Sequence, residues 1–238
     1  MNKIFLSTLA LTMLLWAGGS RAAKAVPNSR LERVRIACVG DSITWGYHVP
    51  QRLVNAYPVV LQRMVGPAYV VRGFGHSGAT ALKHPTWNVS YWKVAEFKQA
   101  TQFKPKVVVL MLGTNDSNHG NLAVMRKDFS RDFIALIRHF RQLSTHPKVF
   151  VCLPPSLGDG TITGPHEAVP KTGVAPRIVE VAKKLHLPLI NLLYAMGGEW
   201  KLFNSDHIHP NIQGQKVLAM LVDRALVRAR VVARRKGR

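Results

Sequence analysis

The first residue that could carry out chemistry is Ser42, in the run Gly40-Asp41-Ser42-Ile43-Thr44. This run follows an apolar stretch rich in β-branched residues, so we expect the serine just beyond the end of a strand. A serine hydroxyl in such a position can act as a nucleophile if a neighbouring base takes its proton. Gly-Asp-Ser is also an ordinary turn sequence, so this run alone does not establish catalysis.

A candidate base lies near the C-terminus, in Asp206-His207-Ile208-His209-Pro210-Asn211. An aspartate three residues before a histidine can hold the imidazole through one ring nitrogen, while the other nitrogen accepts a serine proton. Two other interpretations stay open at this stage. One is a polar loop that leads into a last helix, and the other is a zinc site made from these side chains.

Two more runs follow predicted strands and could stabilise negative charge. In the run from Leu112 to Asp116, the side-chain amide of Asn115 can donate a hydrogen bond to a developing oxyanion. In the run from Gly73 to Thr80, a glycine lets a substrate approach the main chain and offers a backbone N–H. Either run is also compatible with an ordinary loop.

Short apolar runs alternate with amphipathic stretches along the chain. The apolar runs are continuous, which is typical of strands buried on both faces; they are Val34–Val39, Tyr69–Val71, Val107–Leu112, Val149–Leu153 and Leu187–Ile190. The amphipathic stretches predict helices; they are Tyr57–Met64, Leu122–Leu143, Ile178–Leu185 and Val217–Val232. The alternation predicts one α/β domain with a mostly parallel sheet and helices on both faces. Two long irregular stretches, His76–Trp92 and Pro154–Pro176, are expected to border a ligand site at the carboxyl edge of this sheet.

The order and spacing of the four runs resemble the SGNH hydrolases, also called the GDSL esterase/lipase family. That family has serine in a Gly-Asp-Ser block, glycine in a second block, asparagine in a Gly-x-Asn-Asp block and a late Asp-x-x-His. In this chain the corresponding positions are Ser42, Gly78, Asn115, Asp206 and His209. The runs 107–117, 78–82 and 151–155 are similar to the branch labelled sialate O-acetylesterase-like or carbohydrate acetylesterase.

The resemblance implies a flavodoxin-like, three-layer α/β/α sandwich with a mostly parallel five-stranded sheet. It also implies that Ser42 is the nucleophile, that His209 is the general base and that Asp206 orients His209. The oxyanion hole would consist of the Ser42 N–H, the Gly78 N–H and the Asn115 side chain. The implied reaction is hydrolysis of O-acetyl esters on small-molecule or polysaccharide carbohydrates through an acyl-enzyme, with no metal or other cofactor.

The second block departs from the family pattern at two positions. Gly73 stands where the family usually has asparagine, and His76 stands where the branch tends to have a small apolar residue. Together with Asp41 and Asp116, His76 is a candidate for contact with the substrate. The alternative for His76 is a loop position that faces solvent.

The N-terminus resembles a secretion signal. Lys3 precedes an apolar run from Ile4 to Ala17, and Ala23-Lys24-Ala25 fits a small-x-small cleavage site. We therefore expect a signal peptide over residues 1–25, a secreted or periplasmic protein, and no membrane span after cleavage. The alternative is an uncleaved N-terminal anchor.

Composition excludes several classes of protein and indicates an anionic partner. The chain has 238 residues, 47% of them hydrophobic, which excludes general disorder and allows one domain, expected over residues 26–223. The formal charge is +21, and the predicted signal contains three basic and no acidic residues, which leaves +18. Residues 224–238 form a basic tail, expected to continue the last helix and to contact polyanions. No motif for specific nucleic-acid binding is found.

The two cysteines, Cys38 and Cys152, both lie in apolar stretches. We expect two free, buried thiols, although an exported protein could also pair them.

Two alternatives to a carbohydrate esterase stay open. One is a lysophospholipase or thioesterase that uses the same residues, held at anionic membranes by its basic tail. The other is a non-catalytic module on the same fold that binds polyanions or glycans. A preference for acetyl over octanoyl esters would argue against the first alternative. Turnover of any ester would argue against the second.

Overall fold

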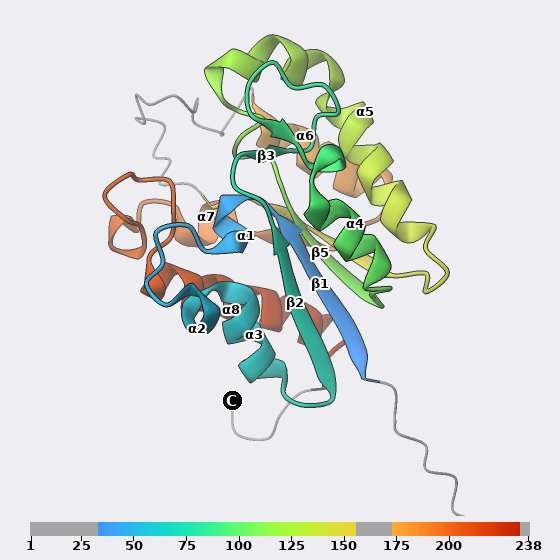
Figure 1. Ribbon diagram of the computed structural model, residues 1–238, viewed down its shortest axis with the longest axis vertical. Coiled ribbons are helices and arrows are strands. Elements are labelled where there is room, and N and C mark those ends of the chain that lie inside the picture. Colours follow the sequence, from blue (N-terminus) through green and yellow to red (C-terminus); the bar gives the residue numbers. More distant parts are fainter. Residues whose placement is uncertain (1–32, 156–172, 234–238) are drawn as a thin grey trace, which may run out of the picture. The chain divides into compact units, whose positions relative to one another are not determined.

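A computed structural model describes residues 33–155 and 173–233, in which a five-stranded parallel sheet lies between two layers of helices (Figure 1). The strand order is β2-β1-β5-β6-β7, with bounds β1 Val34–Gly40, β2 Tyr69–Gly75, β5 Val107–Met111, β6 Lys148–Leu153 and β7 Leu189–Asn191. All five predicted strands are present. Strand β2 continues four residues beyond its predicted end because Arg72 to Gly75 stay in register with Ala37 to Gly40 of β1.

The helices cover both faces of the sheet, as expected. Their bounds are α1 Ser42–Trp45, α2 Arg52–Asn55, α3 Tyr57–Val65, α4 Ala95–Gln102, α5 Leu122–Arg141, α6 Val174–Lys184, α7 Leu192–Met196 and α8 Ile212–Arg228. Short 3₁₀ turns occupy Tyr91–Lys93, His119–Asn121 and Trp200–Leu202. Alternate residues of β1 enter different cores: Ala37 and Val39 pack with α4, α5 and α6, whereas Ile36 and Cys38 pack with α3, α7 and α8. The three-layer α/β/α prediction is therefore confirmed.

The two cysteines are free and buried, as predicted. Cys38 lies in β1 and Cys152 in β6, and β5 runs between these two strands. Strands are spaced about 4.8 Å apart, so two strand spacings exceed the roughly 7 Å that a disulfide can bridge. Burial raises the pKa of the Cys38 thiol to about 12, which keeps it neutral.

The irregular stretch His76–Trp92 contains structure that the sequence did not predict. Strands β3 (Ala79–Thr80) and β4 (Val89–Ser90) pair in parallel as a separate two-stranded sheet. The second predicted irregular stretch falls mostly on residues 156–172, which lie outside the described residues. Helix α6 begins within that stretch, at Val174.

The chain leaves α8 earlier than its amphipathic pattern predicts. The helix ends at Arg228, and Arg230 has a left-handed backbone with φ of 55°. Residues 229–233 then turn back onto β2, where Val232 is buried and the Tyr69 hydroxyl bonds to Val231 O and Ala233 N. Over residues 229–233 the predicted continuation of the helix is thus wrong, because Val232 gains a place in the core by leaving the helix. The rest of the predicted tail, residues 234–238, lies outside the described residues.

Within residues 33–155 and 173–233, no helix is long and apolar enough to cross a membrane. The predicted signal over residues 1–25 lies outside the described residues.

Candidate active site

Ser42 is the first residue of α1, directly after the carboxyl end of β1. Asp41 caps this short helix, since its Oδ1 accepts a hydrogen bond from Ile43 N at 2.9 Å. Gly40 is needed at the turn, because a Cβ there would lie 2.6 Å from Met111 O of the neighbouring strand. The turn thus holds Ser42 at the edge of the sheet, with 6% of its surface exposed.

His209 connects Ser42 to Asp206. Its Nε2 lies 2.8 Å from Ser42 Oγ, and its Nδ1 lies 2.7 Å from Asp206 Oδ2. These three residues, called the triad below, are brought together as the sequence predicts. The arrangement fits a neutral imidazole that donates from Nδ1 and accepts the serine proton at Nε2.

Asp206 is held as an anion by its own loop. Burial alone would raise its pKa, but hydrogen bonds from His209 N, Ile208 N and the His209 ring lower the pKa below its ordinary value. An ionised carboxylate can stabilise the positive charge that His209 would acquire on taking a proton.

Three side chains that the sequence analysis missed position the histidine loop. Asn204 donates to His209 O at 3.0 Å, and Asn211 caps α8 through Gly214 N and also donates to Phe203 O. Gln215, at the first turn of α8, accepts from Tyr57 N and donates to Ile43 O, so it joins the histidine segment to the serine segment. The Asn-x-x-Gly spacing of a helix cap was a signal for Asn211; the sequence held no signal for Gln215.

The two other predicted oxyanion groups lie on the loops after β2 and β5, the two strands that flank β1. Gly78 has a φ of +78°, a left-handed conformation that favours glycine. Asn115 is 8% exposed, and its Nδ2 donates to Ala79 O at 3.0 Å. Because an amide nitrogen carries two hydrogens, one N–H of Asn115 is left for a ligand. The Ser42 N–H, at the first position of its helix, has no acceptor within that helix.

Asp41 and Asp116 do not occupy positions from which they could contact a substrate, because both are fully buried. Burial raises the pKa of Asp41 to about 7, against the lowering effect of hydrogen bonds from Ile43 N and the Thr114 hydroxyl. Burial likewise raises the pKa of Asp116 to about 7, with a smaller contribution from the nearby Asp41. Asp116 accepts hydrogen bonds from Ala81 N and Leu82 N and so fixes the loop after Gly78. We therefore assign both carboxyl groups to loop positioning.

His76 lies on the loop after β2 and is tied to α4. Its Nδ1 is 3.0 Å from Glu96 Oε2, and 38% of its side chain is exposed. Gly73 lies within β2, where an added Cβ would be 3.1 Å from Pro58 of α3. The position at which the family usually has asparagine is therefore packed against a helix in this chain.

An aromatic group beside the triad was not predicted. The Tyr47 ring is centred 4.8 Å from the His209 ring, and His48 Nε2 lies 3.9 Å from Asp206 Oδ2. Trp45 and Tyr47 are 37% and 39% exposed. The run Trp45-Gly46-Tyr47-His48 follows the Ser42 block directly, and this closeness in the sequence was a signal that its rings lie near the triad.

The alternative of a zinc site at residues 206–209 does not fit the geometry. Asp206 Oδ2 and His209 Nδ1 are hydrogen-bonded to each other. In the part of the chain that the structure describes, no group of three or more His, Cys, Asp or Glu side chains is placed to hold a metal ion.

Comparison with curated proteins finds an acetylxylan esterase from Xylanibacter ruminicola that is 31% identical over 227 residues. The match covers 85% of this chain but 45% of the relative, so the chain spans less than half of that relative's length.

Solved structures of the same fold include a carbohydrate acetylesterase family member from Sinorhizobium meliloti, with 20% identity and a TM-score of 0.61 over 82% of this chain and 98% of the other. The lipase/acylhydrolase from Enterococcus faecalis has 23% identity and a TM-score of 0.56 over 81% and 95% of the two chains. The model of the GDSL-like lipase/acylhydrolase family matches residues 38–217, a range that contains every residue of the triad. The chain therefore belongs to the GDSL-like lipase/acylhydrolase family.

Proposed function

We propose that the protein is a serine esterase that removes acetyl groups from carbohydrates. The observation that carries the proposal is the continuous hydrogen-bonded series from Ser42 Oγ through the His209 ring to Asp206, with distances of 2.8 and 2.7 Å. This geometry lets a serine hydroxyl lose its proton to an imidazole that a carboxylate orients.

The reaction would proceed through an acetyl-enzyme. His209 Nε2 takes the Ser42 proton while Oγ attacks the ester carbonyl. The carbonyl oxygen becomes an oxyanion that accepts hydrogen bonds from Ser42 N–H, Gly78 N–H and Asn115 Nδ2. Protonated His209 then donates its proton to the leaving sugar oxygen. A water molecule, deprotonated by His209, then attacks the carbonyl carbon of the acetyl-enzyme. The bond between that carbon and Ser42 Oγ breaks, acetate leaves, and His209 returns the proton to Ser42 Oγ.

Two observations support the substrate class and the location. The curated relative is named an acetylxylan esterase, which supports acetylated carbohydrate as the substrate. The apolar run near the N-terminus, followed by a small-x-small site, supports export to the periplasm or the medium.

Acetate release from O-acetylated sugars tests the proposal, with p-nitrophenyl acetate and octanoate measured beside them. We expect acetate from at least one sugar, preference for acetyl over octanoyl esters, and loss of turnover in Ser42→Ala. Ser130→Ala, a serine on α5, is the control and should keep its activity. Octanoyl preference would instead indicate a lysophospholipase or thioesterase, and no turnover of any ester would indicate a binding module.

A further inference from the structure

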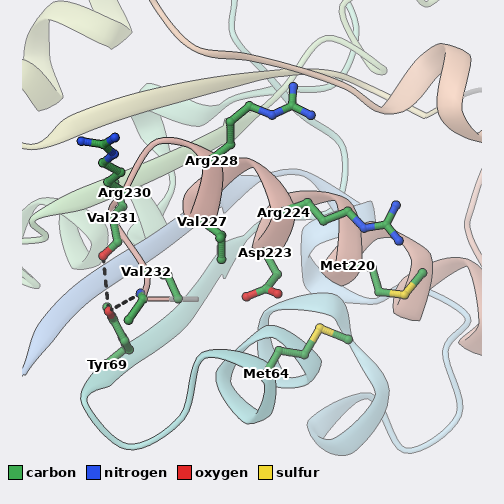
Figure 2. A pocket seen from close by; sticks show the side chains of 11 residues that line it. Met64, Tyr69, Met220, Asp223, Arg224, Val227, Arg228, Arg230, Val231 and Val232 are labelled. Atoms are coloured by element: carbon green, nitrogen blue, oxygen red, sulfur yellow. Dashed lines mark hydrogen bonds between the residues drawn. The ribbon is translucent and has the colours of Figure 1, made fainter. Parts of the chain in front are cut away.

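A pocket of about 1130 Å³ lies at the C-terminal end of α8 (Figure 2). Its walls come from the end of α3, the first residue of β2, the last turns of α8 and the returning segment 230–233. We call it the α8 pocket. Its volume is somewhat above the roughly 300–1,000 Å³ of most small-molecule sites.

The α8 pocket is remote from the triad. Tyr69, which lines it, is paired with Val34 at the amino end of β1, whereas Ser42 follows Gly40 at the carboxyl end. Six residues of strand at about 3.3 Å each put roughly 20 Å between the two ends. An occupant of the pocket therefore leaves the triad open.

The rim of the pocket is positively charged. Arg224, Arg228 and Arg230 line it and are exposed, and no ion pair of theirs is found among residues 33–155 and 173–233. Figure 2 shows their guanidinium groups extending outward around the pocket. With Asp223, the lining carries three positive side chains and one negative side chain. The helix dipole explains a cation in the last turn, such as Arg228, but it does not explain the other two.

The interior of the pocket is largely apolar, apart from the Asp223 carboxylate, which lies between Val232 and Met64 in Figure 2. Met64, Met220 and Val227 line it, and Met220 is 39% exposed. The Tyr69 hydroxyl, which could bind a sugar hydroxyl, is already bonded to Val231 O and Ala233 N. Methionine and aliphatic side chains offer little hydrogen bonding to a sugar, but they adapt well to flexible apolar chains. An apolar interior inside a cationic rim suits an amphiphile with an anionic head.

We propose that the α8 pocket binds anionic phospholipid at a bilayer surface. Phosphate headgroups of the bilayer contact the outward-pointing arginines, and the apolar part of a lipid contacts the methionines. The chain continues beyond the pocket with four more basic residues, Arg234, Arg235, Lys236 and Arg238, and clusters of this size are typical of segments that bind anionic membranes. The proposal does not depend on the esterase reaction.

Co-sedimentation of the full chain with vesicles tests the proposal. The vesicles contain phosphatidylcholine alone or with one third phosphatidylglycerol. We expect binding to the mixed vesicles, and a loss on the order of 100-fold in the combined variant Arg224→Gln/Arg228→Gln/Arg230→Gln. Turnover of p-nitrophenyl acetate should stay at the wild-type level in this variant.

The matched control is Arg126→Gln/Lys127→Gln/Arg138→Gln, which removes three exposed charges from α5 on the other face of the sheet. An equal loss in both combined variants would show a general charge effect and overturn the proposal. Met220→Ser tests the apolar contribution: it should weaken vesicle binding at least threefold without changing the salt concentration that elutes the protein from heparin. Heparin binding without vesicle binding would assign the surface to acidic polysaccharide and would also overturn the proposal.

Discussion

His48 Nε2 lies 3.9 Å from Asp206 Oδ2, the same oxygen that accepts the hydrogen bond of the His209 ring. The two imidazole rings are centred 6.0 Å apart, and about half of the His48 side chain is exposed. A proton on His48 would place a second positive charge beside the carboxylate that serves His209. His48 therefore lies beside the carboxylate that orients His209, at the exposed side of the triad.

Asn115→Ala should lower kcat with little change in KM. The lost donor acts on charge that develops in the transition state, and such losses typically reduce the rate roughly 100- to 1000-fold. The hydrogen bond to Ala79 O is also lost, so the melting temperature must be measured beside the kinetics. A rise in KM at constant kcat would show that Asn115 binds the ground state and the transition state equally, and would contradict its role in the oxyanion hole.

Gln215→Leu should both destabilise the protein and impair the triad. It leaves Tyr57 N and Ile43 O unpaired in the interior, at a cost of about 1–3 kcal/mol for each unsatisfied group. It also removes the connection between the serine and histidine segments, so kcat should fall as well. Gln213→Leu, at an exposed position of the same helix, is the control. It should change neither the free energy of unfolding nor kcat.

Asp41→Asn should reduce the pH dependence of stability. The folded-state pKa of Asp41 is raised from 3.8 to about 7, so between these values the folded state binds more protons than the unfolded state. Its contribution to stability is thus present below pH 3.8 and is lost as the pH rises through 7. Urea unfolding from pH 4 to 8 should show a smaller decline in the variant, in which the helix cap is kept. Glu199 is exposed, so Glu199→Gln serves as the control and should keep the full decline of the unfolding free energy with rising pH.

Two truncations test which part of the C-terminus contributes to the stability of the fold. Removal of residues 230–238 takes away buried Val232 and both partners of the Tyr69 hydroxyl, so the melting temperature should fall by several degrees. Removal of residues 234–238 spares these contacts and should leave the melting temperature and small-ester turnover unchanged. Equal melting temperatures for both truncations would show that the returning segment adds no stability.

The sheet could be predicted because its strands are buried on both faces. Val107 to Met111 are all buried, and such continuous apolar runs can be recognised as strands in a single sequence. Helix α4 was missed because its sequence is mostly polar and Ala100 is its only fully buried residue. The end of α8 was misplaced because Val231 and Val232 continue the apolar pattern although the chain has already turned.

The triad could be proposed from residue types, their spacing and the resemblance to the SGNH hydrolases, but its supports could not. A buried glutamine such as Gln215 bonds to main-chain atoms, and no sequence pattern records which backbone groups a fold leaves unpaired. Asp41 and Asp116 were wrongly predicted to contact the substrate for the same reason. Their positions next to Ser42 and Asn115 in the sequence suggested contact with a ligand. Their carboxyl groups bind loop N–H groups instead.

The hydrogen bond between Ser42 and His209 joins positions 167 residues apart in the chain. During synthesis, the histidine emerges only after nearly the whole domain, and it must then dock beside a turn made long before. A ribosome-bound fragment that ends before the loop of Asp206 and His209 would contain the serine without its base. Hydrolytic activity would therefore appear only after synthesis has passed His209, as a sign that both ends of the site have been made.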